Sequence, residues 1–146
     1  MIHIVDLCYV RVGTEDLEAT LRFATEKLGL QLVRREGDRV YMRCGVRDHD
    51  ICYISGDPKD HVLGFEVTDE PALEAAFSEL SAAGLVVRHG TNEECADRRV
   101  LAFVSFQDPT GNSFDLAVRP HKATRRYFPS RDAGITEFSH VGLRTT

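Results

Sequence analysis

The sequence predicts an α+β fold made of two βαβββ units. Three observations support this prediction. The apolar pattern of the 146-residue chain repeats with a period of about 55 residues. In each copy, one strand-like run is followed by a helix-like stretch and then by three short strand-like runs. A glycine closes each predicted helix, at Gly29 and at Gly84.

The first unit is expected over about residues 3–56. It opens with an apolar strand at residues 4–13, and Thr14 is the expected N-cap of a helix that ends at Gly29. The turn-like sequences EGD and DHD separate the strands that follow. These strands are expected at residues 30–37, 39–45 and 50–56.

The second unit is expected over residues 61–118. Its first strand covers residues 61–69, and its helix has Thr68 or Asp69 as N-cap and Pro71 in the first turn. The stretch QDPTGN is a strong turn signal between its last two strands. The three closing strands are expected at residues 85–90, 98–109 and 112–118.

The last part of the chain begins the same pattern a third time. Residues 119–134 are expected to be a linker, and their basic cluster at residues 121–131 is expected to be solvated rather than to bind phosphate. Residues 135–146, ITEFSHVGLRTT, read as another opening strand. We therefore expect residues 1–118 to form one module, and residues 135–146 to be the first strand of a second, missing module.

Composition excludes several classes of protein. The net charge of −5 argues against a nucleic-acid surface. No apolar run approaches the roughly 18 residues that span a bilayer, and no signal peptide is visible, so a cytoplasmic protein without a membrane partner is expected. The four cysteines form no CxxC pair and are expected to be reduced and buried.

The pattern resembles the vicinal oxygen chelate superfamily of glyoxalase I, bleomycin-resistance proteins and extradiol dioxygenases. The resemblance covers residues 3–146 and is carried by residues 6–30, 63–85 and 106–118 together. It implies that the two units form one module with a curved mixed sheet. It is closest to the N-terminal module of two-module extradiol dioxygenases, in which the second module holds the iron.

In that superfamily, metal ligands come from the first strand of each unit and from the last strand of the second. The resemblance places these positions at Cys8, Val62 and Asp115, with spacings of 54 and 53 residues. A mononuclear Fe(II) oxygenase needs two histidines and one carboxylate. Valine cannot bind a metal, so this set is a poor one.

Two residues remain open as ligands of the first module. His61 lies beside the expected position, and strand alternation puts it on the apolar face with Leu63, unless a β-bulge re-aims it. Asp115 is expected to face away from Leu116 and Val118. It is either a hydrogen-bonded or solvated carboxylate or a metal ligand.

His140 has no conflict of this kind. Val141 and Leu143 are expected to face the core, which leaves His140 on the opposite face with Gly142. The resemblance makes His140 the first metal ligand of the second module. The other ligands are expected beyond Thr146.

The resemblance implies the N-terminal structural module of an extradiol dioxygenase, which inserts O2 into a catechol using Fe(II), or Mn(II) in some relatives. We expect no catalytic residue in this chain, no cofactor in residues 1–118 and no activity of the chain alone. The exposed edge of the last strand predicts a homodimer, with the C-terminal strand exchanged between chains.

Two alternatives are open. The first is a metal-free small-molecule-binding protein of the bleomycin-resistance type, with an apolar pocket lined by Cys8, Val10, Val12 and Val62. The second is a glyoxalase-like homodimeric metalloenzyme, in which His61 and Asp115 join ligands across the interface.

Overall fold

The computed structural model describes residues 1–130 and 134–143, and the chain divides into two compact units. Each unit combines segments that are distant in the sequence. They are Met1–Cys8, Val62–His121 and residues 139–143 for unit 1, and Tyr9–His61 with Lys122–Phe138 for unit 2. Strand β1 (Ile4–Thr14) therefore contributes residues to both units.

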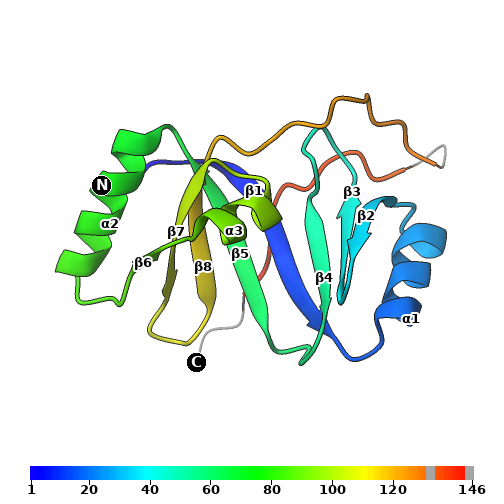
Figure 1. Ribbon diagram of the computed structural model, residues 1–146, viewed down its shortest axis with the longest axis horizontal. Coiled ribbons are helices and arrows are strands. Elements are labelled where there is room, and N and C mark those ends of the chain that lie inside the picture. The colour runs from blue at the N-terminus through cyan, green and yellow to red at the C-terminus, as the bar shows by residue number, and fades with distance from the viewer. Residues whose placement is uncertain (131–133, 144–146) are drawn as a thin grey trace. The chain divides into compact units, whose positions relative to one another are not determined.

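Unit 2 contains the first βαβββ copy (Figure 1). Besides β1, its elements are α1 (Leu17–Arg22), the π-helical turn η1 (Phe23–Lys27), β2 (Gln31–Glu36), β3 (Arg39–Arg43) and β4 (Ile51–Ser55). The strand order is β2-β3-β4-β1, with β1 parallel to β4 and the other neighbours antiparallel. The predicted order of strand, helix and three strands is confirmed here.

Unit 1 contains the second copy (Figure 1). Its elements are β5 (His61–Val67), α2 (Glu70–Ala82), β6 (Arg88–His89), α3 (Asn92–Arg98), β7 (Ala102–Gln107) and β8 (Ser113–Val118). The order is β5-β8-β7-β6, with β5 parallel to β8. The predicted order of strand, helix and three strands is confirmed, but two strands are shorter than expected. The strand expected over residues 85–90 covers only Arg88–His89. The strand expected over residues 98–109 begins only at Ala102, because α3, which was not predicted, ends at Arg98.

Side-chain caps explain where the two main helices begin. Asp16, and not the expected Thr14, is the N-cap of α1, because its carboxylate accepts a hydrogen bond of 2.8 Å from the amide three residues on. Asp69 caps α2 in the same way at 2.9 Å, as predicted. Gly29 and Gly84 follow the helices with φ of 74° and 87°, the left-handed backbone that favours glycine.

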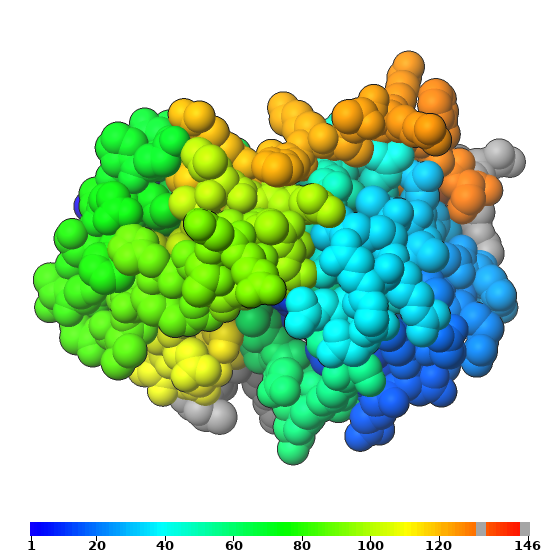
Figure 2. All heavy atoms as spheres, in the orientation of Figure 1, coloured from blue at the N-terminus to red at the C-terminus, as the bar shows by residue number. Residues whose placement is uncertain are grey.

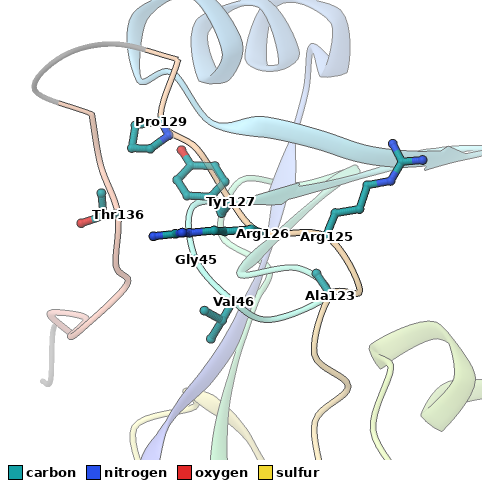
Figure 3. A pocket seen from close by; sticks show the side chains of 8 residues that line it. All are labelled: Gly45, Val46, Ala123, Arg125, Arg126, Tyr127, Pro129 and Thr136. Carbon is teal, nitrogen blue, oxygen red and sulfur yellow. The ribbon is translucent and has the colours of Figure 1, made fainter.

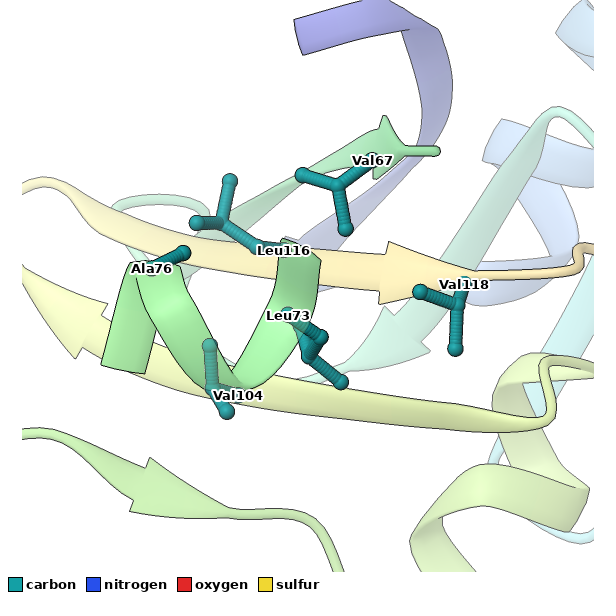
Figure 4. Packing of buried hydrophobic residues seen from close by; sticks show 6 residues of the cluster. All are labelled: Val67, Leu73, Ala76, Val104, Leu116 and Val118. Carbon is teal, nitrogen blue, oxygen red and sulfur yellow. The ribbon is translucent and has the colours of Figure 1, made fainter. Parts of the chain in front are cut away.

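The core of unit 1 lies between α2 and the sheet. Figure 4 shows side chains of α2 directed toward those of β5, β7 and β8. The cluster contains Val67, Leu73, Ala76, Val104, Leu116 and Val118. Burial of such side chains contributes about 1.5–3 kcal/mol for each Val or Leu. α2 is the longest helix, and no helix within the described ranges could cross a membrane.

The core of unit 2 lies on the side of α1 and η1. Ala24 and Leu30 pack with Met42 and Cys44, and Ile51 and Tyr53 of β4 join them. Because Met42 and Ile51 are partners in the β3–β4 register, they lie on one face of the sheet. That face is the one covered by the helix.

The segment that follows β8, predicted to be a linker, packs on unit 2. The Ala123 amide donates a hydrogen bond of 2.9 Å to the Val46 carbonyl. The hydroxyls of Tyr127 and Ser130 donate to the Gly29 carbonyl at 3.4 and 3.2 Å, and so bind an end of the helical segment. In Figure 2 the orange atoms of this segment lie against the cyan atoms of unit 2. The segment is thus held by hydrogen bonds rather than free in solvent.

Residues 135–146, predicted to be an opening strand, have no strand in their described part, residues 135–143. Residues 144–146 lie outside the described ranges. A strand needs a neighbour that bonds its backbone. The strand assignment therefore stays a prediction.

Candidate functional site

Two of the three expected metal-ligand positions lie on one face of unit 1. In the parallel β5–β8 pairing, Val62 is the partner of Ser113 and Gly64 is the partner of Asp115. Partners in register share a face, and side chains alternate along each strand. Leu116, the neighbour of Asp115, packs in the α2 cluster. Val62 and Asp115 therefore face away from α2, as predicted.

Asp115 is engaged by an arginine. Its side chain is 0% exposed, and its Oδ2 accepts a hydrogen bond of 2.7 Å from Nε of Arg98. The Arg98 guanidinium also lies 4.2 Å from the centroid of the Phe103 ring. A cation bound at Oδ2 of Asp115 would compete with this guanidinium. No group of three His, Cys, Asp or Glu that could hold a metal occurs in the described part of the chain.

Arg98 is positioned by helix α3, which was not predicted from the sequence. Thr91 and Glu94 form a capping box, with bonds of 3.2 Å to the Glu94 amide and 2.9 Å to the Thr91 amide. Arg88 donates to both Glu94 oxygens at 2.8 Å, and these bonds lower the pKa of Glu94 to about 2. The Thr-x-x-Glu pattern was the sequence signal for this helix.

The structure corrects the expected position on β1. Val10 is the partner of Ile51 and Val12 is the partner of Tyr53, and both partners belong to the helix-side cluster. Val10 and Val12 therefore face the helix, and Cys8 has the same parity. The residue that faces away from the helix, as Val62 does in unit 1, is Tyr9. The apolar pocket predicted from Cys8, Val10, Val12 and Val62 is thus wrong, because alternate residues were assigned to the wrong face.

The corrected register also changes the alignment of β1 with the C-terminal segment. Equating the two first-ligand positions of the sequence analysis pairs Cys8 with His140. Shifting this alignment by one residue pairs Leu7–Val12 with Phe138–Leu143. Apolar residues now coincide at both ends of these segments, and Val10 lies over Val141. His140 then corresponds to Tyr9, the position on the open face of unit 2.

On that face of unit 2, the buried His49 and the Arg34 guanidinium both contact the Asp48 carboxylate. His49 stacks on Tyr9 with ring centroids 6.1 Å apart, and its Nδ1 lies 3.0 Å from Oδ2 of Asp48. Arg34 donates to the same oxygen at 2.5 Å, and its guanidinium lies 3.5 Å from the Tyr41 ring centroid. Burial lowers the pKa of His49, and the hydrogen bond from His49 helps to lower that of Asp48 to about 2. These side chains fill the face on which a metal would need open positions.

The other two predicted ligands belong to no group of three metal-binding side chains among residues 1–130 and 134–143. Nδ1 of His61 is 3.0 Å from the carbonyl of Lys59, and the β5–β8 pairing runs without a shift from Val62 to Glu66. The bulge that would re-aim His61 is therefore not seen in these residues. His140 is exposed, and its Nδ1 lies 3.0 Å from Oγ of Ser139. Its role as a ligand stays a prediction.

Extradiol dioxygenases resemble this chain in sequence. A 1,2-dihydroxynaphthalene dioxygenase of Sphingobium xenophagum is 31% identical over 90% of this chain and 45% of its own length. A biphenyl-2,3-diol 1,2-dioxygenase of Sphingomonas paucimobilis is 31% identical over 88% and 44%. An iron-dependent extradiol dioxygenase of Rhodococcus jostii is 28% identical over 96% and 49%. The chain thus spans a little under half the length of these relatives.

Solved structures agree with the sequence comparison. A catechol 2,3-dioxygenase superposes with a TM-score of 0.82 and 28% identity, over 90% of this chain and 45% of that one. The homoprotocatechuate 2,3-dioxygenase of Arthrobacter globiformis, at 18% identity and a TM-score of 0.74 over 86% and 39%, supports the fold alone. The predicted α+β fold is therefore confirmed. The family model described as Glyoxalase/Bleomycin resistance protein/Dioxygenase superfamily matches residues 3–116, and the chain belongs to this superfamily.

Proposed function

We propose that this chain is the N-terminal structural module of a two-module extradiol dioxygenase that cleaves a catecholic ring with O2. The observation that carries the proposal is the extent of the match. About 90% of the chain aligns with about 45% of ring-cleaving relatives. A module of this size leaves room for a second one of similar length in such an enzyme.

The residues at the three metal-ligand positions of this chain support a structural role. Tyr9 packs on His49, Val62 has no donor atom, and Asp115 is paired with Arg98. A metal site needs converging donors with open positions for substrate and oxygen. We therefore infer that residues 1–118 hold no metal and that the chain alone is inactive.

His140 is the one residue of the described chain that we assign to the metal centre. Its imidazole would bind Fe(II), or Mn(II), together with a histidine and a carboxylate of the following module. The metal supplies a Lewis acid for the two hydroxyls of the catechol and a position for O2. His140 would place an imidazole ligand at the start of that module, on the face opposite the apolar residues Val141 and Leu143.

The two alternatives receive less support. A metalloenzyme that uses Asp115 across a dimer interface would have to break the buried pair with Arg98. A binding protein of the bleomycin-resistance type was expected to use Val10 and Val12 in its pocket, and these face the helix. We retain the prediction of a cytoplasmic homodimer with an exchanged C-terminal strand. Light scattering on the purified chain tests whether it dimerises.

The experiment that separates the structural module from the metalloenzyme is metal analysis of the purified 146-residue chain. The chain is incubated with Fe(II) without oxygen and desalted. Its iron content is measured, and then its O2 uptake with 1,2-dihydroxynaphthalene. The proposal predicts far less than one iron per chain and no O2 uptake. One iron per chain that is lost in Asp115→Ala, but not in the control His121→Ala, would instead establish the homodimeric metalloenzyme.

A further inference from the structure

The basic cluster at residues 121–131 helps to form a pocket in unit 2. Residues 122–130 lie against the loop between β3 and β4, where the Arg43 guanidinium donates a hydrogen bond of 3.0 Å to the Arg125 carbonyl. The hollow between loop and segment has a volume of about 250 Å³. This is close to the lower end of the range for small-molecule sites, so it fits a small ligand.

The walls of the pocket are mostly apolar. The Tyr127 ring and Pro129 line one side, and Val46 and Ala123 line the other (Figure 3). Tyr127 is fixed because its hydroxyl lies within hydrogen-bond distance of the Gly29 and Ile135 carbonyls, at 3.4 and 3.1 Å. The aromatic wall therefore has a defined position without a ligand.

One guanidinium enters this apolar space. In Figure 3 the Arg126 side chain runs between Tyr127 and Val46 toward Thr136, whereas the Arg125 side chain points away. Arg126 forms no ion pair within the described ranges, and its only ring contact there is with Phe128 at 5.4 Å. A cation beside an apolar wall favours an anion that also has an apolar body.

The acidic groups near the pocket do not compete for Arg126. Asp50 is 3% exposed, and its Oδ2 accepts the amides of Cys44 and Gly45 at 2.7 and 3.1 Å. This carboxylate is thus buried and already hydrogen-bonded to the backbone of the loop between β3 and β4. Glu137, which acts on the Cys44 thiol electrostatically, is exposed to solvent.

We propose that this pocket binds a small planar carboxylate. The carboxylate would accept two hydrogen bonds from the Arg126 guanidinium, while the planar body lies against the apolar wall that Val46, Ala123 and Pro129 help to form. Phosphate fits less well, because the pocket offers one inward guanidinium and apolar walls rather than several converging donors. The site requires neither a metal nor a catechol, so it is independent of the proposed function.

Benzoate is the probe that tests this site, with calorimetry or amide chemical shifts of the 146-residue chain as the readout. We expect saturable binding that weakens as salt is added. Benzamide has the same shape without the charge, and acetate has the charge without the ring. Both should bind at least about tenfold more weakly, because each lacks one half of the recognition.

Three variants locate the site. Arg126→Gln should weaken benzoate binding about tenfold, through loss of the charge-assisted pair. The control Arg125→Gln removes the same charge and should change binding less than about threefold, because the Arg125 side chain points away from the pocket in Figure 3 and its charge is screened. Val46→Asp, at a position 68% exposed, keeps the fold and should repel the anion. Benzoate binding that is absent, equal to that of benzamide or unchanged in Arg126→Gln would overturn the proposal.

Discussion

Removal of Arg98 tests how much its buried ion pair with Asp115, one of the expected metal-ligand positions, contributes to stability. The Arg98 and Asp115 side chains are 9% and 0% exposed, and the bonded atoms are 2.7 Å apart. At an effective dielectric constant of about 20, Coulomb's law gives about 6 kcal/mol of gross attraction at that distance. Desolvation offsets much of this, but a buried charge that loses its partner typically costs about 3–5 kcal/mol. We therefore expect Arg98→Met to lower the free energy of unfolding by about 3–5 kcal/mol.

Urea denaturation followed by circular dichroism measures the effect, and a double-mutant cycle separates charge from packing. Asp115→Leu should also destabilise, because it leaves the Arg98 guanidinium buried without its partner. The double variant should be more stable than Arg98→Met, since neither charge remains. A loss below about 1 kcal/mol in Arg98→Met, or simple additivity of the two changes, would refute the reasoning.

Three further changes test other parts of the structure. Burial keeps the folded-state pKa of His49 below its unfolded value, so its contribution to stability is present above about pH 6.5 and is lost as pH falls. In urea denaturation, the free energy of unfolding should therefore fall less between about pH 7 and about pH 5 in His49→Phe than in the unchanged protein. An equal fall in both proteins would contradict this. Thr91→Ala should cost about 1 kcal/mol by removing half of the capping box with Glu94, whereas an unchanged urea midpoint would exclude the cap. Tyr127→Phe should cost about 1 kcal/mol by leaving the Gly29 carbonyl with fewer donors, and faster amide exchange at residues 122–130 would report release of the segment.

The repeat could be predicted because both copies carry the same local sequence signals for strands, helix ends and turns. Asp69 before the helix of the second copy and glycine at the ends of both helices are backbone signals that depend on few distant contacts. Alternation along β8 also predicted correctly that Asp115 and Leu116 face opposite sides. Such features follow from strand and helix geometry alone.

The register of β1 could not be predicted in the same way. Both of its faces carry apolar residues, with Leu7 and Tyr9 on one and Cys8 and Val10 on the other. Only the pairing with β4 shows that Val10 faces the helix. A shift of one residue moves every side chain to the other face, and this produced the incorrect pocket.

The parts missed by the sequence analysis depend on tertiary contacts. Arg98 acts on a carboxylate 17 residues away, which no local pattern indicates. The segment at residues 122–130 is polar and basic, as linkers are, and it is held by hydrogen bonds to the distant residues Gly29 and Val46. The capping box at Thr91 was a local signal that could have been used.

The most direct test of the central claim is to supply the second module that the proposed function requires. Residues 1–146 are fused to the part of the Sphingobium xenophagum dioxygenase that follows its matching segment, and iron content and O2 uptake with 1,2-dihydroxynaphthalene are measured. The account predicts about one iron per chain and O2 uptake, with both lost in His140→Ala and both retained in the control His121→Ala. Undiminished iron and O2 uptake in a folded His140→Ala fusion would contradict the assignment of His140 and with it the proposed place of this chain in the enzyme.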